Sequence, residues 1–412
     1  MAAQQQQVAQ PGQYFDVPGI GGGTQWSEQD ETTVSLLTTL ASGNQVPVNG
    51  ISQFKQTDVV LDWLVEIDFT QTFTAGGATF VDSDYAPWNM IGPVSLPIQN
   101  QYKSVDVASG IDLYIFNLIR PFEKTDQTNQ AYAPIGDFAG STPLGYAFAN
   151  NAQPNLVNAA QWAHTAAGWN AILRLPASQT FDIYYDLALT GEPVAAPHAA
   201  IVSPQYMAGS ARVITPLVTL NALTGNADVA PVNSSGGGPT IAGTATMTFR
   251  RKINYAANPA LEPPVYGWQY RWHTTNFQLN GVSVRDIQIP QETGQLLMAY
   301  VRMFDPAANG GIGAPISLAN VTRVQLQFGS GLLRFDGTPR QLQHLFLKQH
   351  GFLLPKGVLC FDLALDQNGN LTNRRALNLL TTSGVLVHLT FSSATSSTAY
   401  AVLGTESLVF VA

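Results

Sequence analysis

Charged side chains are scarce in this chain of 412 residues, because Asp, Glu, Lys and Arg together make up only 11% of it. An average soluble domain has about 25%. A surface with so little charge must gain its solubility from other polar groups, or be covered by neighbouring molecules. The deficit therefore suggests a protein that works inside an assembly. An ordinary secreted or thermally robust β protein is the alternative.

Basic residues are the scarcer of the two signs, with 19 Lys and Arg against 27 Asp and Glu, so the net charge is −8. Proteins that bind nucleic acid generally need a basic footprint. The composition therefore argues against a nucleic-acid-binding role, and we expect no specific nucleic-acid contact.

Cysteine and long apolar runs are also lacking. The one cysteine, Cys360, cannot form an intramolecular disulfide and is expected to be a small core residue. The first residues lack the basic-then-apolar pattern of a secretory signal. No apolar run approaches the roughly 18 residues that a membrane span needs. We therefore expect a soluble chain that assembles inside a cell.

Motifs of the common catalytic and metal sites are absent as well. The sequence has no phosphate-binding loop and no His-Glu-x-x-His, Gly-x-Ser-x-Gly or Cys-x-x-Cys pattern. Its histidines are scattered, and His344 and His350 do not have the i, i+4 spacing of a helical metal pair. We therefore predict a protein that is not an enzyme, with no catalytic residue, no cofactor and no metal site.

Strand-like alternation is what the chain does have. In residues 59–69 every odd position is apolar, while the even positions include Asp62, Glu66 and Asp68, so a long strand with one buried face is predicted. The acidic row could bind a cation, but a solvated outer face is the expected role. Similar patterns predict strands at 33–40, 90–98, 169–175, 181–189, 212–223, 244–255, 265–279, 284–289, 296–304, 321–328, 358–365, 384–391 and 408–411.

Two further segments have distinctive patterns. Residues 111–122 are largely apolar on both faces, which predicts a central strand covered on both sides. Residues 339–350 predict a helix, because Thr338 is a candidate N-cap and Pro339 suits the first helical position. The apolar stripe of this helix consists of Leu342, Leu345 and Phe346.

Residues 258–264 divide the chain, because their three prolines exclude a helix or a central strand. We interpret them as the linker between two β-sandwiches. The predicted organisation is an N-terminal tail and lead-in at 1–50, a first sandwich at 51–257 and a second at 265–412. A Gly-, Pro- and Asn-rich insertion at 123–167 interrupts the first sandwich, and insertions of this length are usually functional or interfacial.

Two groups of residues are candidates for contacts between chains. One is the low-complexity tail at 1–30, which contains Gln4, Gln5, Gln6 and Gln7 and is expected to be ordered only by a partner. The other is an aromatic row on one face of a predicted strand, made of Trp268, Tyr270 and Trp272. Such a row can stack sugars or bases, but it more often belongs to a core or to a subunit contact.

One segment resembles a known family. Residues 352–362 read Phe-Leu-Leu-Pro-Lys-Gly-Val-Leu-Cys-Phe-Asp and follow the predicted helix. With that helix they resemble the last third of the major capsid protein of tectivirus-like, internal-membrane bacteriophages, where a helix leads into a Phe-Pro-Lys-Gly-Val strand with a cysteine. Residues 59–72 look similar to the family's first long strand, and residues 244–255 fit its crossover between two halves. The Gln-rich start is similar too.

The resemblance implies an all-β fold of two jelly-roll β-sandwiches in tandem, a double jelly roll, with short helices. It implies a major capsid protein whose homotrimers form the pseudo-hexagonal capsomers of an icosahedral shell around an internal membrane. The partners would be further copies of the chain, vertex or penton proteins, minor capsid proteins and that viral membrane. The chain would be found in the virion after assembly in the host cytoplasm. Residues Gln4–Gln7 would then belong to an inward-facing assembly tail.

Two other functions stay open at this point. A carbohydrate-binding or glycan-active β-sandwich protein would use the aromatic row and the neutral polar surface. A receptor-binding spike or fibre protein is also β-rich and trimeric, but it usually carries a fibrous or repeat segment, which this sequence lacks.

Overall fold

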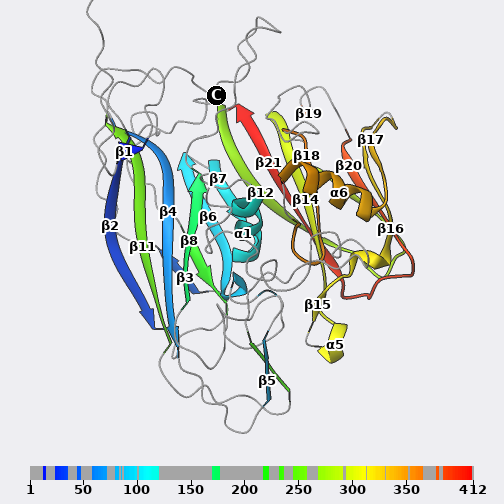
Figure 1. Cartoon of the computed structure of the whole chain (residues 1–412), viewed down its shortest axis with the longest axis horizontal. Coiled ribbons are helices and arrows are strands. Elements are labelled where there is room, and N and C mark those ends of the chain that lie inside the picture. The colour runs from blue at the N-terminus through cyan, green and yellow to red at the C-terminus, as the bar shows by residue number, and fades with distance from the viewer. Residues whose placement is uncertain are drawn as a thin grey trace, which may run out of the picture.

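The chain forms two β-sandwiches that stand side by side, with their long strands running in nearly the same direction (Figure 1). A computed structural model describes residues 13–14, 24–35, 44–47, 58–71, 79–82, 85, 88–99, 102–119, 169–176, 217–221, 232–235, 245–257, 268–290, 294–311, 313–329, 331–350, 353–364, 377–379 and 384–410. The strands of the first half are β1 (Gln13–Tyr14), β2 (Thr24–Ser35), β3 (Asn44–Pro47), β4 (Asp58–Gln71), β5 (Thr79–Asp82), β6 (Ile91–Gln99), β7 (Tyr102–Val107), β8 (Trp169–Pro176), β9 (Leu217–Leu220), β10 (Val232–Ser235) and β11 (Ala245–Ala257). Those of the second half are β12 (Trp268–Gln278), β13 (Val284–Gln288), β14 (Gly294–Asp305), β15 (Ala314–Pro315), β16 (Val321–Gln327), β17 (Leu333–Gly337), β18 (Val358–Asp362), β19 (Leu377–Asn378), β20 (Leu386–Phe391) and β21 (Tyr400–Phe410).

Helices are few and short in the described residues. The two longer ones are α1 (Gly110–Ile119) and α6 (Pro339–His350), and α5 (Ala308–Gly311) is a single irregular turn. Two turns of 3-10 helix, η1 (Trp88–Met90) and η4 (Leu318–Asn320), each come directly before a strand, β6 and β16 respectively.

Eight strands build the first sandwich in two layers. One layer has the order β2-β11-β4-β8, and the other has the order β3-β9-β6-β7. When these eight strands are numbered along the chain, the layers read 1-8-3-6 and 2-7-4-5. This is the order of a jelly roll, in which two Greek keys close an antiparallel double sheet. Strand β1 extends the first layer beyond β2, while β5 and β10 form a separate two-stranded ribbon.

The second sandwich repeats this order. Its layers are β12-β21-β14-β18 and β13-β20-β16-β17, which again read 1-8-3-6 and 2-7-4-5. The helices repeat as well, because α1 and α6 both connect the fifth strand of their half to the sixth, and η1 and η4 both precede the fourth. The predicted fold class, two jelly rolls in tandem with short helices, is confirmed.

A parallel strand pair joins the two halves. Strand β7, the fifth of the first half, pairs with β12, the first of the second half, at Val105–Trp272 and Asp106–His273. The pairing merges one layer of each half into a ten-stranded sheet. The predicted linker at 258–264 and the insertion at 123–167 lie outside the described residues, so the domain boundaries stay a prediction.

The core of the second sandwich follows from strand alternation. In β20 the inward positions Val387, Leu389 and Phe391 are buried and the residues between them are half-buried. Strand β14, by contrast, is buried at nearly every position, because it lies inside the sheet and is covered on both faces. The lone cysteine, Cys360, is buried in β18 as predicted.

Residues 111–119 correct one prediction, because they form helix α1 and not a central strand. All ten residues of α1 are buried. A helix surrounded by protein is apolar on every side, and periodicity alone cannot distinguish it from a buried strand. The predicted helix at 339–350 is confirmed as α6.

The predicted N-terminal tail is wrong in its last part. Residues 24–30 belong to β2, which pairs with β11 along nearly its whole length. Because β2 is mostly polar in sequence, it shows no apolar alternation, and only its end was included in the predicted strand at 33–40. The predicted strand at 181–189 lies outside the described residues, and most of the others appear within a few residues of their expected bounds.

Candidate functional site at the seam between the two sandwiches

Helix α1 lies between the two sandwiches, at the centre of the molecule in Figure 1. A polar cap starts it: the Ser109 hydroxyl accepts a hydrogen bond from the Asp112 backbone N–H at 3.2 Å and donates one to Asp112 Oδ2 at 2.7 Å. Ser109 is therefore the N-cap of α1, and its hydroxyl also binds the side chain of the third helical residue. It holds the Asp112 carboxylate in the first turn, where the helix dipole favours negative charge.

The Asp112 carboxylate connects the first sandwich to β14 of the second. Arg302 Nε donates to Oδ1 at 3.0 Å and Arg302 Nη2 donates to Oδ2 at 3.2 Å, while the Tyr300 hydroxyl donates to Oδ1 at 3.1 Å. Asp112 is 0% exposed and Arg302 is 1% exposed. Two buried charges of this kind depend on each other, because either one alone would lack compensation.

Tyr300 is held in its neutral form at this site. Burial raises the pKa of its hydroxyl well above the ordinary value, and the neighbouring Asp112 carboxylate raises it further. The hydroxyl therefore stays protonated and remains a donor to Asp112. Residues 112, 300 and 302 thus form a compact polar cluster within an apolar seam.

Aromatic side chains extend the contact between the halves. Phe116 of α1 stacks on Trp272 of β12, with ring centroids 4.9 Å apart and planes inclined by 7°. Its edge meets Tyr300 at 5.1 Å and 72°. Trp272 Nε1 donates to Glu406 Oε1 at 3.1 Å, which satisfies the one donor of the indole and places it against a carboxylate that is 0% exposed.

Polar groups also join the ends of the parallel strand pair. The Ala108 backbone N–H donates to Thr274 Oγ1 at 2.6 Å. Asp106 accepts a hydrogen bond from Lys103 Nζ at 3.0 Å, and its other oxygen lies 3.8 Å from His273 Nδ1. The seam therefore has main-chain, ionic and aromatic components, and these fix the two sandwiches relative to each other.

The structure describes only part of the predicted contact residues. Gln4, Gln5, Gln6 and Gln7 lie outside the described residues, and so do the side chains of Trp268 and Tyr270 on β12. Trp272 is 0% exposed, so the core alternative holds for it, and it is not available to stack a sugar or to contact a second subunit.

Sequence reasoning missed the cluster around Asp112. Ser109 and Asp112 match the Ser-x-x-acid signature of a helix start, which would have identified α1. Their meeting with Tyr300 and Arg302 could not have been inferred, because those residues lie about 190 positions further along the chain.

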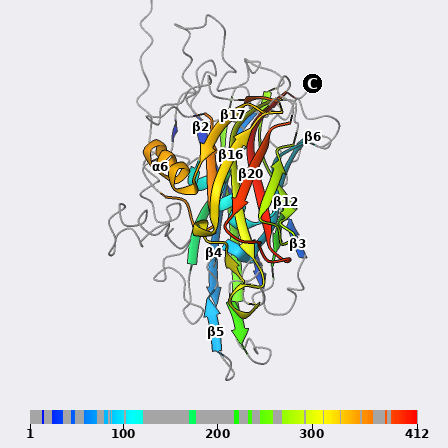
Figure 2. The ribbon, with the colours of Figure 1, turned by 90° about the vertical axis from the view of Figure 1, so that its right-hand side faces the viewer.

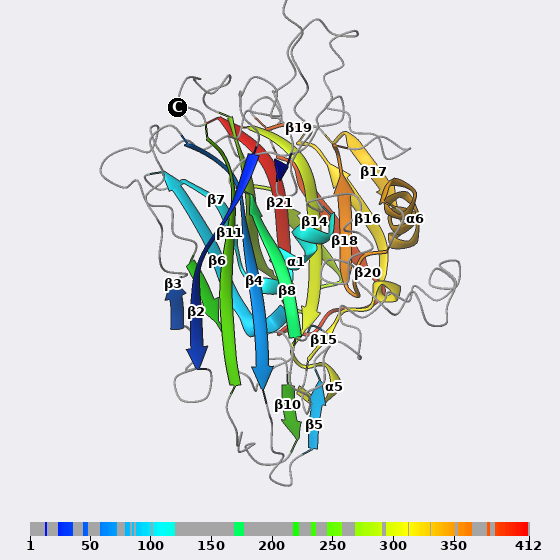
Figure 3. The ribbon, with the colours of Figure 1, turned by 60° about the vertical axis from the view of Figure 1, so that its left-hand side comes forward.

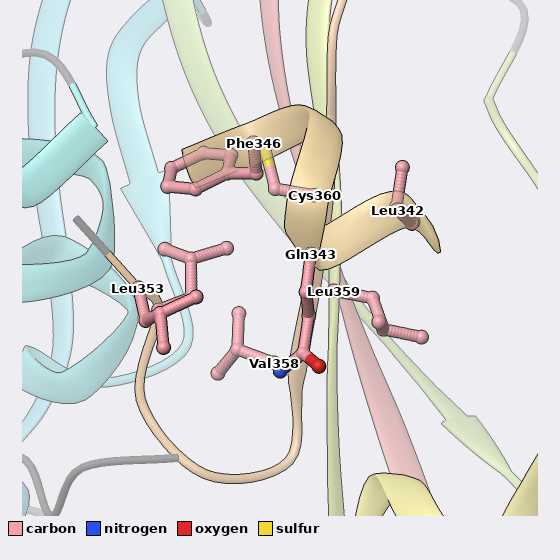
Figure 4. Close-up of a pocket in the computed structure, with 8 residues that line it drawn as sticks. Leu342, Gln343, Phe346, Leu353, Val358, Leu359 and Cys360 are labelled. Carbon is pink, nitrogen blue, oxygen red and sulfur yellow. The ribbon is translucent and has the colours of Figure 1, made fainter. Parts of the chain in front are cut away.

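Sites for small ligands are limited in the part of the chain that the structure describes. A cavity of about 10 Å³ lies between α6 and β18 and is lined by Leu342, Gln343, Phe346, Leu353, Leu354, Val358, Leu359 and Cys360 (Figure 4). This volume is about that of one water-sized sphere.

In the described ranges, no group of three or more His, Cys, Asp and Glu side chains could hold a metal ion. Nor is any described helix long and apolar enough to cross a membrane.

No protein-family model and no curated protein matches this chain. Solved structures do match it. The chain is similar to the STIV major capsid protein, with a TM-score of 0.55 and 13% identity over 94% of this chain and 97% of that one. A chain in the atomic structure of Sulfolobus Turreted Icosahedral Virus matches with a TM-score of 0.56 and 10% identity, over 94% of this chain and 91% of that one.

A third match is PBCV-1 VP54, fitted into a cryo-EM reconstruction of the virophage Sputnik. It has a TM-score of 0.53 and 14% identity, and the match covers 96% of each chain. A likeness at this level of identity reports the fold. Over nearly its whole length, the chain is a double jelly roll of the kind found in viral major capsid proteins.

Proposed function

We propose that this chain is a major capsid protein whose homotrimers form the pseudo-hexagonal capsomers of an icosahedral virus shell. The supporting observation is the pair of jelly rolls with the same strand order, in a chain that matches capsid proteins over nearly its whole length. The chain would then be located in the virion, and its main partners would be further copies of itself.

The chain would act through its shape, as a building block of the shell, and not by catalysing a reaction. Two similar sandwiches side by side present two similar units in one chain, so three copies around a threefold axis present six. Such an arrangement packs like a hexagon while keeping closed threefold symmetry. The role is structural and needs no catalytic residue. The low charge of the chain fits large surfaces that become covered in the assembly.

The seam would give the capsomer its rigidity. A pseudo-hexagonal outline requires a fixed angle between the two sandwiches of each chain. The Asp112–Arg302 ion pair, the Phe116–Trp272 stack and the β7–β12 strand pair together oppose a hinge motion. Buried ion pairs lose much of their stabilisation when their geometry changes, which suits a joint that must not bend.

Further partners belong to the same proposal. They are vertex or penton proteins, minor capsid proteins and an internal membrane of a bacteriophage assembled in the host cytoplasm.

Residues Gln4–Gln7 would form part of an inward-facing tail that becomes ordered on assembly. Deletion of residues 1–13 should then leave trimers intact and prevent normal shells, and normal particles from this truncation would contradict the role of the tail.

The proposal is tested by the native mass of the purified chain. Light scattering after size exclusion should give three times the 44.2 kDa of one chain, and negative-stain images of that peak should show hexagonal particles. A monomer that does not change with salt or concentration would contradict the proposal.

A further inference from the structure

Helices α1 and α6 occupy the same place in the two sandwiches and begin in the same way. In α6 the Thr338 backbone N–H donates to Gln341 Oε1 at 2.8 Å, and the Gln341 N–H donates to Thr338 Oγ1 at 3.3 Å. In α1, Ser109 and Asp112 form the corresponding cap. The two caps align the helices residue by residue.

The two helices differ in what covers their outer faces. The inner face of α6, with Leu342, Gln343 and Phe346, packs on β18 of its own sandwich (Figure 4). The outer face contains exposed residues, namely Arg340, Gln341, His344 and Lys348. In α1 the outer face is buried, because the second sandwich covers it.

Counting from the caps identifies the residues that correspond. Asp112 and Phe116, which contact the second sandwich, correspond to Gln341 and Leu345 of α6. The outer face of α6 therefore matches the part of α1 that contacts the next jelly roll. Among the described residues, no jelly roll covers this outer face of α6.

Strand β17 occupies the same position in the second sandwich as β7 does in the first. Both are the fifth strand of their half, and β7 pairs with β12 through Val105 and Asp106. The residues at the same distance before the helix cap in β17 are Arg334 and Phe335. Among the described strands, β17 is the last of its layer. Beside this edge lie two exposed apolar residues, Leu332 at 65% and Leu333 at 47%.

Strand β2 is the counterpart of β12, because each is the first strand of its half. Strand β1 covers the edge of β2 only at Thr24 and Gln25, and no other described strand pairs on that side. Figures 1 and 3 place β2 and the β16–β17 pair on opposite sides of the molecule. The two segments therefore lie on opposite sides of the chain, as a head-to-tail contact between copies requires.

The charges of the two segments are opposite. Strand β2 contains Glu28, Asp30 and Glu31 and has no Lys or Arg. Helix α6 contains Arg340 and Lys348 and has no Asp or Glu. In a chain that has only 11% charged residues, this separation of sign distinguishes strand β2 from helix α6, and the basic residues Arg250, Arg251 and Lys252 next to β2 belong to its neighbour β11. Complementary charge of this kind guides association and selects the partner surface.

We propose that the α6–β17 surface, consisting of Leu332, Leu333, Arg340, Gln341, His344 and Lys348, binds the first sandwich of a second copy of this chain along β2. The contact repeats between chains the one that β7 and α1 make with β12 and β14 within a chain. Figure 2 looks onto the right-hand side of Figure 1, where β16, β17 and α6 lie. Three such contacts close a ring. The inference rests on the proposed function, because it names the surface through which the trimer forms.

A matched pair of exposed residues tests the surface. Leu333 and Val284 are both 47% exposed, but Val284 is on β13, at the other edge of the same layer. Leu333→Asp should change the native mass from three chains to one, whereas Val284→Asp should leave the trimer intact. Because both side chains are exposed in the single chain, circular dichroism and the unfolding temperature of the chain should report a folded protein for both variants.

The five outcomes are distinguishable. Loss of the trimer in Leu333→Asp alone supports the α6–β17 surface. Trimers in both variants, or loss of the trimer in both or in Val284→Asp alone, overturn this assignment while the proposed function stands. A wild-type chain that is monomeric contradicts the proposed function itself.

Reversing the charges on α6 and on β2 tests whether β2 of a second copy is the partner of the α6–β17 surface. Arg340→Glu with Lys348→Glu should weaken the trimer at least about tenfold at low salt, and the loss should shrink as salt screens the charges. Adding Glu28→Lys, Asp30→Lys and Glu31→Lys should restore the trimer if β2 is the partner. No restoration by the β2 set would overturn the assignment to β2.

Discussion

Arg302 and Asp112 form a two-point ion pair inside the seam, and Arg323 and Asp336 form one of the same geometry at the surface. In the first pair the two N–O distances are 3.0 and 3.2 Å, and in the second they are 2.8 and 2.6 Å. The side chains of the first pair are 1% and 0% exposed, against 53% and 33% for the second. The same two-point ion pair therefore occurs once in a buried environment and once at the surface of this protein.

The comparison yields a stability prediction. Asp112→Asn keeps the shape of the side chain but leaves the Arg302 charge buried without its partner, which should lower the free energy of unfolding by about 3–5 kcal/mol. Asp336→Asn should cause a much smaller change, because water solvates the exposed Arg323 charge. Urea unfolding at one fixed chain concentration measures both. Equal losses in the two variants would mean that burial does not determine the strength of these pairs.

The alkaline side of the stability profile should depend on the buried tyrosines. Burial raises the pKa of Tyr114, so its folded form stays neutral where the unfolded form ionises, near pH 10. The stability contribution is complete below pH 10 and is lost as pH rises beyond it, by about 1.4 kcal/mol per pH unit. Tyr114→Phe should remove this part of the slope.

The measurement for Tyr114 is the slope of unfolding free energy against pH, from pH 9 to 11, rather than the stability at one pH. Phe116→Leu serves as the control, because it changes core packing without removing a titrating group. A slope that is the same in Tyr114→Phe and in Phe116→Leu would show that Tyr114 does not titrate differently in the two states.

The sequence predicted the second half of the fold better than the first. Strands β16 and β20 and helix α6 are marked by alternation or by a cap, and β14 is marked by a short apolar run, which are local signals. Strand β2 has no apolar alternation, and α1 is apolar on all sides, so local patterns did not identify either of them. The strand orders 1-8-3-6 and 2-7-4-5 come from contacts between distant segments. No local pattern contains that information, and only the family resemblance suggested it.

The candidate site was less predictable still. Asp112 looks like an isolated acid in an apolar run, and Arg302 looks like an interruption in the apolar strand β14. Each would be costly to bury alone, so each implies a partner, but the sequence does not say which one. Their pairing follows from the parallel contact between β7 and β12, which places α1 beside β14.

The Tyr300 ring lies over Gly404 on the neighbouring strand β21, and their close approach gives a further prediction. A Cβ added at Gly404 would lie 2.1 Å from the Tyr300 ring, which is far too close. Gly404→Ala should therefore force the ring away from Asp112 and destabilise the protein by about 1–3 kcal/mol or more. Tyr300→Ala alone should also destabilise it, because it removes a buried ring.

The double variant separates steric conflict from other effects. With Tyr300→Ala present, Gly404→Ala meets no ring, so the two losses should add up to more than the loss in the double variant. Urea unfolding of all four proteins completes the cycle. Additive losses would mean that the residues do not interact, and the destabilisation by Gly404→Ala would then need another cause.

The two helix caps provide the last prediction, because they are equivalent in position and differ in burial. Thr338 is exposed, so Thr338→Ala should cost about 1 kcal/mol, as is typical for an N-cap. Ser109 is 7% exposed and also donates to the buried Asp112 carboxylate. Ser109→Ala should therefore cost about 1–3 kcal/mol more, because that carboxylate loses a hydrogen bond that water cannot replace. Ser109→Thr and Thr338→Ser keep the hydroxyl and should restore most of the stability. Equal losses for the two alanine variants would mean that the cap of α1 acts only locally, and that the Asp112 cluster keeps its strength without Ser109.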